Sequence, residues 1–191
     1  MISIITNQIG YRSKDKKVAV FRNVIGTTFS VIDSQTGKEV YRSTVSGPID
    51  NASSEETIVL GDFSSVTTPG TYQVKMDSYG VSYPFVIDQD VYKPILKDLF
   101  RMYYLQRCGI EVSTELGGIY SHTACHTSLA TIYGTNKEID VTGGWHDAGD
   151  YGRYMVAAAV TVADLLYAYE CNCNIFDRNF NIPESNSNVP D

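Results

Sequence analysis

Two carboxylates stand three residues apart, at Asp147 and Asp150, within a glycine-rich segment that covers residues 143–152. The glycines allow the backbone to turn tightly and a ligand to approach closely. Because an apolar segment of helical character follows at once, we expect the pair at a helix entrance, where the helix dipole favours negative charge. Two carboxylates in such a position are suited to holding a water molecule and removing its proton.

The spacing of the two carboxylates limits the reaction that they can support. Hydrolysis of a glycosidic bond with inversion needs a base and a protonated acid about 6.5–9.5 Å apart. Asp147 and Asp150 are too close in sequence for these opposed roles, so they fit better as two groups that hold one water, with the acid elsewhere. The alternative is that the pair has no chemical role and consists of a helix cap and a solvated acid. The glycines, Trp145 and His146 around the pair favour the role in holding a water molecule.

Four potential metal ligands, two cysteines and two histidines, occur before and within this segment: Cys108, Cys125, His126 and His146. Two thiolates and two imidazoles form a closed tetrahedral zinc set with no open position for a substrate. The adjacency of Cys125 and His126, and the place of His146 beside the carboxylates, favour a structural zinc that fixes the loop carrying Asp147. Buried free thiols with unrelated histidines, and a nucleophilic cysteine, are the less favoured alternatives.

The residues around these sites have roles that the sequence leaves open. Arg153 either orients a carboxylate or lies in solvent, and Tyr151 and Tyr154 face either a sugar or the core. Cys171 and Cys173 are two residues apart near the expected end of a helix, and such close positions rarely form a disulfide. We therefore interpret these two cysteines as structural.

Composition and charge exclude some partners. The chain of 191 residues has a formal net charge of −7, which argues against nucleic acid because phosphate contacts need clustered Lys and Arg. The most apolar stretch, residues 154–169, is interrupted by Thr161 and Asp164 and is too short to cross a bilayer, so we expect no membrane partner. No leader pattern follows Met1, which predicts a cytoplasmic chain or a mature secreted chain with an added Met.

The segment up to residue 88 has the composition of a β-sheet domain. Short runs rich in β-branched and aromatic residues alternate there with turn signals. We predict strands at Ile2–Thr6, Lys17–Arg22, Thr28–Asp33, Glu39–Arg42, Thr57–Leu60, Thr71–Met76 and Tyr83–Ile87. About seven short strands with regular turns fit an immunoglobulin-like sandwich. This half contains no Cys or Trp, so the sandwich lacks an antibody-type disulfide core.

From Asp88 onward the hydrophobic period becomes helical. Apolar residues at helical spacing predict a helix over residues 91–103, with Asp90 as its N-cap and Gly109 as its C-terminal stop. A second helix is expected over residues 151–170, and because it is apolar on most sides it should be buried among other helices.

The rest of this half carries weaker signals. Residues 110–142 are irregular apart from a short helix expected near 127–133, and residues 179–191 have the polar, proline-containing composition of an extended connector. Two or three helices with nearly all-round apolar surfaces cannot cover one another. We therefore expect the helical part to be incomplete.

The chain resembles, along its whole length, glycoside hydrolase family 9, the cellulase family with an N-terminal immunoglobulin-like domain. The segment 143–152, Gly-Gly-Trp-His-Asp-Ala-Gly-Asp-Tyr-Gly, carries the most specific part of the resemblance. Supporting segments lie at residues 7–11, 103–109, 124–126 and 182–185.

The resemblance implies an (α/α)6 barrel after the sandwich. We therefore expect a sandwich domain over residues 1–88 and, over residues 89–191, only the opening helices of the barrel, whose remainder would be a partner of this chain. The resemblance also implies inverting hydrolysis of β-1,4-glucan, so the expected substrate is a β-glucan oligosaccharide or polysaccharide.

Individual roles also follow from the resemblance at matching positions. Asp150 corresponds to the base and Asp147 to its partner in holding the water. The family's structural zinc ligands match Cys108, Cys125, His126 and His146. The family's general acid is a Glu near the far end of the barrel, beyond Asp191, and its Ca²⁺ sites also lie largely beyond that residue. Glu184 belongs to a different motif and is not that acid.

Two other functions stay open. One is a non-catalytic module whose sandwich contacts carbohydrate or braces a neighbouring domain, and it predicts sugar binding that survives substitution of Asp147 and Asp150. The other is an exo-acting β-glucosidase or glucosaminidase of the same family. We expect the 191 residues alone not to hydrolyse glucan, because without the acid the leaving oxygen stays unprotonated.

Overall fold

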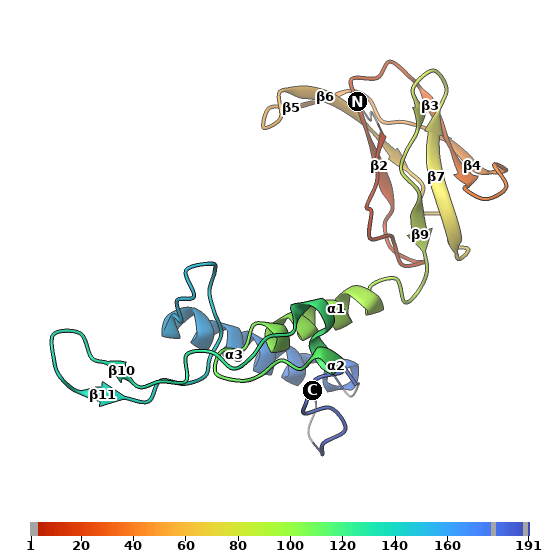
Figure 1. The fold of residues 1–191 in the computed structure, drawn as a ribbon. Coiled ribbons are helices and arrows are strands. Elements are labelled where there is room, and N and C mark those ends of the chain that lie inside the picture. The colour runs from red at the N-terminus through yellow and green to blue at the C-terminus, as the bar shows by residue number, and fades with distance from the viewer. Residues whose placement is uncertain (1–3, 177–178, 189–190) are drawn as a thin grey trace. The chain divides into compact units, whose positions relative to one another are not determined.

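A computed structural model describes residues 4–176, 179–188 and 191. Contacts within the chain divide it into two compact units, Met1–Pro94 and Ile95–Asp191. The first unit is built around strands, and the regular elements of the second are mainly helices (Figure 1). None of the helices in the described part of the chain is long and apolar enough to cross a membrane.

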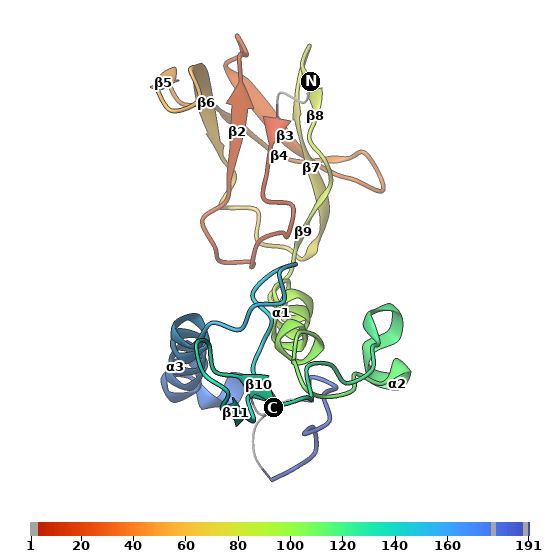
Figure 2. The same cartoon turned by 60° about the vertical axis from the view of Figure 1, so that its left-hand side comes forward.

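The first unit consists of two antiparallel sheets, which Figure 2 shows from a second side. One sheet has the order β1-β2-β6-β5, formed by Ile4–Ile5, Val18–Arg22, Glu56–Asp62 and Ile49–Asn51. The other has the order β4-β3-β7-β8, formed by Glu39–Thr44, Thr28–Asp33, Gly70–Met76 and Gly80–Val81. Strand β9 (Phe85–Ile87) also pairs with β7. The architecture is the predicted immunoglobulin-like sandwich.

The sandwich core is made by alternating residues that face inward from both sheets. Along β7, Tyr72, Val74 and Met76 are buried while the residues between them are partly or fully exposed. An aromatic cluster closes one part of the core, in which the Phe85 ring centroid lies 5.4 Å from that of Tyr11 and 5.4 Å from that of Phe63. Edge-to-face and tilted contacts of this kind stabilise a core beyond the burial of area alone.

Each of the seven predicted strands overlaps an observed strand. The first is shorter than predicted, since β1 covers Ile4–Ile5, and residues 2 and 3 lie outside the described part. Strands β5 and β8 were not predicted, because they contain three and two residues and have no run of buried side chains.

The second unit contains two longer helices joined by an irregular segment. Helix α1 (Lys93–Leu105), which begins at the end of the first unit, is followed by short α2 (Thr114–Gly117) and the 3₁₀ turn η1 (Gly118–Tyr120). A small hairpin, β10 (Ala130–Thr131) and β11 (Glu138–Ile139), precedes α3 (Met155–Cys171) and the 3₁₀ turn η2 (Cys173–Ile175). Among the described residues of this unit, the buried side chains are Tyr104, Cys108, Val112, Phe176 and Phe180.

The predicted ends of the first helix were wrong. Helix α1 begins at Lys93, three residues after Asp90, so Asp90 is not its N-cap, and the Asp90 carboxylate instead pairs with the Lys93 ammonium. The helix ends at Leu105 because the backbone then turns away to pair with the segment near residue 145. Gly109 (φ +83°) therefore lies in the following loop and not at the end of the helix.

The predicted helix near residues 127–133 was also wrong, because that segment forms strand β10 of the hairpin, with Ala130 paired to Ile139. Gly134 (φ +75°) lies in the turn that follows β10. The expected connector over residues 179–191, of which residues 189 and 190 lie outside the described part, is not simply extended in the rest. Phe180 is buried with its ring centroid 5.1 Å from that of Phe100, and its backbone N–H donates to Asp191 Oδ2 at 2.7 Å.

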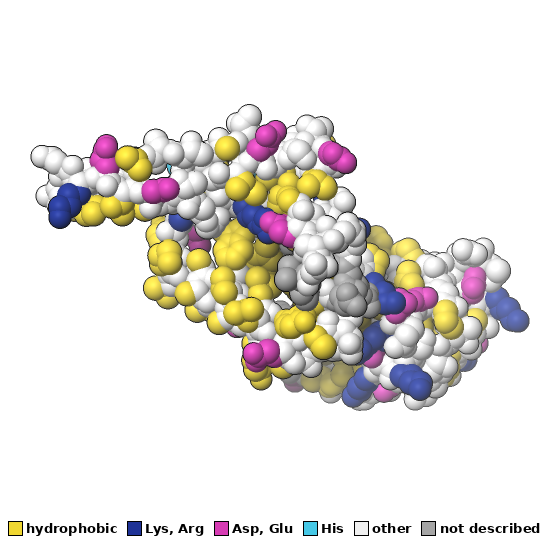
Figure 3. Space-filling view, turned by 90° about the horizontal axis from the view of Figure 1, so that it is seen from below, with side chains coloured by type: hydrophobic (Ala, Val, Ile, Leu, Met, Phe, Trp, Pro, Cys, Tyr) yellow, Lys and Arg dark blue, Asp and Glu magenta, His cyan; other side chains and the backbone are white. Residues whose placement is uncertain are grey.

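The second helix differs from its prediction in position and burial. Helix α3 begins at Met155 instead of residue 151, because residues 147–152 form a separate turn. None of its residues is buried among the described part of the chain, and Met155 and Val156 are both about four-fifths exposed. Figure 3 shows hydrophobic side chains gathered on this surface of the molecule. The expectation of a helix buried among others is thus not met within these residues.

Candidate functional site

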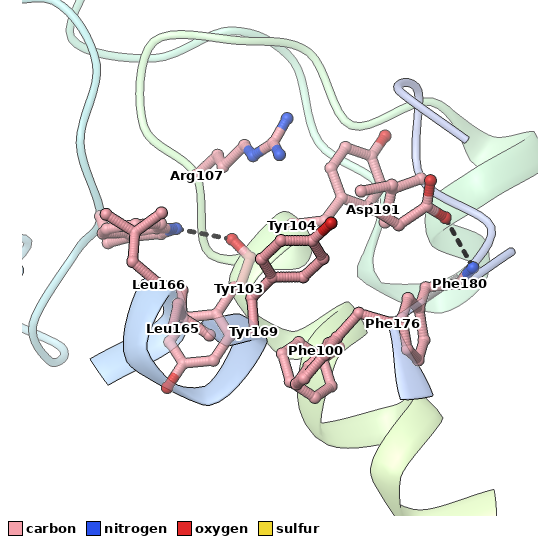
Figure 4. A pocket seen from close by; sticks show the side chains of 12 residues that line it. Phe100, Tyr103, Tyr104, Arg107, Leu165, Leu166, Tyr169, Phe176, Phe180 and Asp191 are labelled. Atoms are coloured by element: carbon pink, nitrogen blue, oxygen red, sulfur yellow. Dashed lines mark hydrogen bonds between the residues drawn. The ribbon is translucent and has the colours of Figure 1, made fainter. Parts of the chain in front are cut away.

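The segment that carries the two carboxylates is docked on the end of α1. The indole Nε1–H of Trp145 donates to the Tyr103 carbonyl at 2.7 Å, a bond drawn in Figure 4. Tyr103 lies in the last turn of α1, where carbonyls have no partner within the helix, so the indole satisfies one of them. The Cys108 N–H donates to the Gly144 carbonyl at 2.8 Å. These contacts fix the backbone immediately before His146.

The two carboxylates lie in a tight turn. The Asp147 N–H donates to the Gly152 carbonyl at 2.8 Å, and the Tyr151 N–H donates to the Ala148 carbonyl at 3.0 Å. Tyr151 has a φ of +55°, which bulky residues rarely adopt. Because α3 begins only at Met155, the carboxylates precede the helix by several residues and are not at its entrance, contrary to the prediction.

Asp150 is held in its ionised form by two donors. Its Oδ1 accepts a hydrogen bond from the Gly152 N–H at 2.9 Å, and its Oδ2 accepts one from the Tyr154 hydroxyl at 2.9 Å. These two bonds hold the pKa of the Asp150 carboxyl below its ordinary value, because each stabilises the charged form. Asp150 is solvent-exposed, so its oxygens are also open to water.

Asp147 borders a small cavity. The cavity has a volume of about 180 Å³, and Tyr103, Trp145, His146 and Tyr154 are among the side chains that line it. Asp147 itself is exposed. Both carboxylates are thus open to solvent, and Asp147 also borders a hollow with aromatic walls.

The four predicted metal ligands converge. Their ligand atoms all lie within 4.8 Å of one another, although Cys108, Cys125, His126 and His146 come from three separate segments. The Cys125 sulfur is 3.9 Å from the Cys108 sulfur and 3.8 Å from His146 Nε2. Tetrahedral zinc with Zn–S bonds of about 2.3 Å would place two sulfurs about 3.8 Å apart, so this donor set fits the ion. Both cysteines are free.

The electrostatics of the cluster oppose charge in the absence of a cation. Burial raises the pKa of the Cys108 thiol, and its neighbour Cys125 raises it further. Burial likewise lowers the pKa of His146, and electrostatic interactions with nearby His126 and Arg153 lower it as well. A neutral imidazole is already in the form that binds a metal, whereas the thiols must lose protons when the ion binds.

Neighbouring residues have structural contacts that the sequence did not reveal. The Arg153 guanidinium donates to the carbonyls of Val141 and Gly143, so it binds the loop backbone and neither orients a carboxylate nor lies free in solvent. Tyr154 contacts Asp150, and Tyr151 contacts two histidine rings. Cys171 and Cys173 are exposed free thiols.

Glu184 is engaged in an ion pair. Its Oε1 accepts a hydrogen bond from Arg107 Nη1 at 2.6 Å, and this bond lowers the pKa of the Glu184 carboxyl. A carboxylate held in this way is ionised near neutral pH and is not suited to donating a proton. The geometry is thus in line with the expectation that Glu184 is not the general acid.

A larger apolar cavity lies between α1, α3 and the C-terminal residues. It has a volume of about 360 Å³, and Figure 4 shows the aromatic rings of Phe100, Tyr103, Tyr169 and Phe176 around it. Its few polar lining groups include Arg107 and Asp191. It shares Trp145 and Tyr103 with the small cavity beside Asp147.

Comparison with known families covers both units. Residues 2–81 match the family described as cellulase N-terminal ig-like domain, and residues 92–185 match glycosyl hydrolase family 9. The chain belongs to glycosyl hydrolase family 9. The predicted family is thereby confirmed, and so is the predicted order of a β-sandwich followed by helices of the hydrolase domain. The proposed boundary between residues 88 and 89 stays a prediction.

Relatives with assigned names are longer than this chain. A cellodextrinase of Butyrivibrio fibrisolvens is 41% identical over 186 residues, which are 96% of this chain and 33% of the relative. Endoglucanase D of Acetivibrio thermocellus is 38% identical over 191 residues, which are 97% of this chain and 30% of the relative. The chain of this family 9 member thus spans about a third of the length of these curated relatives.

Solved structures of the family agree with the fold. A metagenome-derived glycoside hydrolase family 9 endoglucanase matches with a TM-score of 0.87 and 34% identity, over 98% of this chain and 37% of that chain. A Zn-binding triple mutant of the family 9 endoglucanase J30 matches with a TM-score of 0.82 and 32% identity, over 90% of this chain and 33% of that chain.

Proposed function

We propose that this chain supplies the sandwich and the water-activating part of an enzyme that hydrolyses β-1,4-glucosidic bonds in β-glucans with inversion. The proposal rests chiefly on the turn over residues 147–152. In this turn, hydrogen-bond donors at both oxygens of Asp150 stabilise its ionised form. Asp147 is exposed in the same turn and borders an aromatic-walled cavity. Relatives named as endoglucanases and a cellodextrinase support the substrate class.

In this proposal Asp150 is the general base. It removes a proton from a water molecule that attacks the anomeric carbon, and Asp147 accepts the second hydrogen bond of that water. The low pKa of Asp150 keeps it in the basic form across the neutral range. The protonated acid that serves the leaving oxygen is expected outside these residues, which is why the chain alone should not hydrolyse glucan.

We further propose that Cys108, Cys125, His126 and His146 hold a structural Zn²⁺. With four protein ligands the ion offers no position to a substrate, and it supplies a cross-link between the loops after α1 and the turn of the carboxylates. His146 directly precedes Asp147, so the cross-link would restrict where that carboxylate can lie. A Ca²⁺ site is proposed only for regions beyond this chain, as is the remainder of the barrel.

A chimera tests the catalytic proposal. In it, this chain replaces the matching third of the Butyrivibrio fibrisolvens cellodextrinase. We expect release of reducing ends from cellodextrins or carboxymethyl cellulose, with the inverted anomer seen first by NMR, and a loss of at least about 100-fold in Asp150→Asn. Asp77→Asn, an exposed residue of the sandwich, is the matched control.

Two results would contradict the proposal. One is a chimera whose Asp150→Asn variant hydrolyses as fast as its parent. The other is hydrolysis by the 191-residue chain alone that Asp150→Ala abolishes, since this would mean that no acid from elsewhere is needed. Binding of cellodextrin that survives substitution of both carboxylates, without any hydrolysis in the chimera, would instead indicate a carbohydrate-binding module.

A further inference from the structure

Tyr151 has a backbone conformation that its side chain disfavours. Its φ of +55° lies in the left-handed region, where the Cβ of a bulky residue is crowded by its own backbone. Glycines at positions 149 and 152 are close by in the same turn, and either could adopt such a φ without strain. A tyrosine in this conformation persists only where surrounding contacts determine it.

The contacts that hold Tyr151 are made by its ring. The ring centroid lies 5.1 Å from that of His146, nearly perpendicular at 85°, and 6.1 Å from that of His126. The two histidine rings are themselves 5.2 Å apart. The three rings therefore form one cluster, with separations and tilts that are favourable for aromatic pairs.

The ring contacts the solvent-accessible ligands of the proposed metal site. Cys108 is buried, whereas His126 is exposed and His146 is half-buried. Tyr151 remains 61% exposed, so burial of its own surface does not account for its position. It lies against the two imidazoles on a side of the ligand cluster that solvent reaches.

The backbone of the same residue belongs to the carboxylate turn. The Tyr151 N–H donates to the Ala148 carbonyl at 3.0 Å, and the flanking bond from the Asp147 N–H to the Gly152 carbonyl is 2.8 Å long. Asp150, whose oxygens are held by Gly152 and Tyr154, is the preceding residue. One side chain thus contacts the metal ligands while its backbone shapes the turn of the proposed base.

We infer that Tyr151 is a positioning residue that covers the accessible side of the metal site and couples occupation of that site to the Asp147–Gly152 turn. This inference rests on the proposed zinc site. A chelator or water must reach the ion to remove it, and in this inference the ring of Tyr151 screens the approach past the two histidines that it contacts. Outer-shell groups that hydrogen-bond metal ligands typically change metal affinity by about 10–100-fold, and we expect a similar size of effect for a ring that packs on two of the ligands.

Substitutions at position 151 separate the ring from the backbone. Tyr151→Phe keeps the ring, whereas Tyr151→Gly removes it and suits the left-handed φ. Tyr151→Asn is a second ring-free variant that also tolerates this φ, in case the glycine variant folds poorly. Tyr133→Ala, at a fully exposed tyrosine of the hairpin turn, is the control for loss of a surface ring.

The first readout is the rate of zinc transfer from the full 191-residue chain to a colorimetric chelator. We expect Tyr151→Phe and Tyr133→Ala to release zinc within about twofold of the wild-type rate, and the ring-free variants to release it about 10–100 times faster. The second readout is the zinc-induced NMR shift of the Asp147 and Gly152 amides, which should persist in Tyr151→Phe and shrink in Tyr151→Gly.

These experiments test the role of Tyr151 separately from the existence of the zinc site. A wild-type chain that binds no zinc would overturn the metal site and the inference together. A chain that binds zinc, but whose ring-free variants release it at the wild-type rate, would overturn the role of Tyr151 as a cover. Unchanged amide shifts in Tyr151→Gly would overturn the coupling to the turn.

Discussion

Gly61, in strand β6, is a position where any side chain is expected to destabilise the sandwich. A Cβ at this position would lie 2.8 Å from Phe21 Cε2 and 2.8 Å from Phe29 Cε1. Both rings are buried in the sandwich core, so neither can move into solvent. Overpacking of a core costs about 1–3 kcal/mol, and replacing a strand glycine by alanine returns about 0.5–1 kcal/mol of backbone entropy. Gly61→Ala should therefore lower the free energy of unfolding by about 1 kcal/mol at the middle of these ranges, and by about 2.5 kcal/mol at most.

That loss is large enough to measure in a unit of this size. For a domain of 60–100 residues, 1 kcal/mol shifts the melting temperature by about 4–8 °C, so the middle value predicts a decrease of about 4–8 °C. Calorimetry would follow the transition of the sandwich, with far-UV circular dichroism to identify it. Gly47→Ala is the matched control, because nothing lies within 4 Å of a Cβ there. Equal melting temperatures for the two variants would refute the packing argument.

Three further predictions concern the helical unit. Trp145→Phe should destabilise the end of α1 by about 1–3 kcal/mol, because it leaves the Tyr103 carbonyl without its donor, and amide hydrogen exchange of the last turn would detect this. Zinc affinity should fall as the pH is lowered, by up to about 100-fold per pH unit where both thiols are protonated, since burial raises the pKa of Cys108 and binding must release the protons. Competition titrations at several pH values would measure it, and a pH-independent affinity would contradict thiolate ligation. Tyr154→Phe should raise the pKa of Asp150 towards its ordinary value, because the Tyr154 hydroxyl stabilises the carboxylate. A ¹³C NMR titration of the Asp150 carboxyl would measure this change, and an unchanged pKa would contradict the hydrogen bond from Tyr154.

The strands of the sandwich could be predicted because burial and sequence alternate together. In β7 the buried Tyr72, Val74 and Met76 are separated by residues that are less buried, which is the period that a strand requires. Strands β5 and β8 carry no such signal, because they are held by pairing with β6 and β7 and not by buried side chains.

The helical unit was predicted less accurately for identifiable reasons. A short apolar run such as residues 129–133 fits a helix or a strand equally well by pattern, and its pairing with residues 138–139 decided the outcome. The start of α3 was misplaced because the left-handed backbone of Tyr151 is set by tertiary contacts that residue type does not reveal.

The candidate site, too, could be predicted only in part from the sequence. The four metal ligands could be named from donor chemistry together with the adjacency of Cys125 and His126 and the place of His146 beside the carboxylates. The contacts of Arg153 with two loop carbonyls and of Tyr154 with Asp150 could not, because they depend on where separate segments meet. The supporting residues of a site are thus less predictable than its ligands.

X-ray absorption spectroscopy of the zinc-loaded chain tests the central claim most directly. The account predicts one zinc per chain, with two sulfur neighbours at about 2.3 Å and two nitrogen neighbours at about 2.0–2.1 Å. Cys125→Ser should remove one sulfur from that shell, whereas Cys171→Ser, at an exposed thiol, should leave it unchanged. A shell without sulfur, or the same spectrum in Cys125→Ser, would contradict the proposed metal centre.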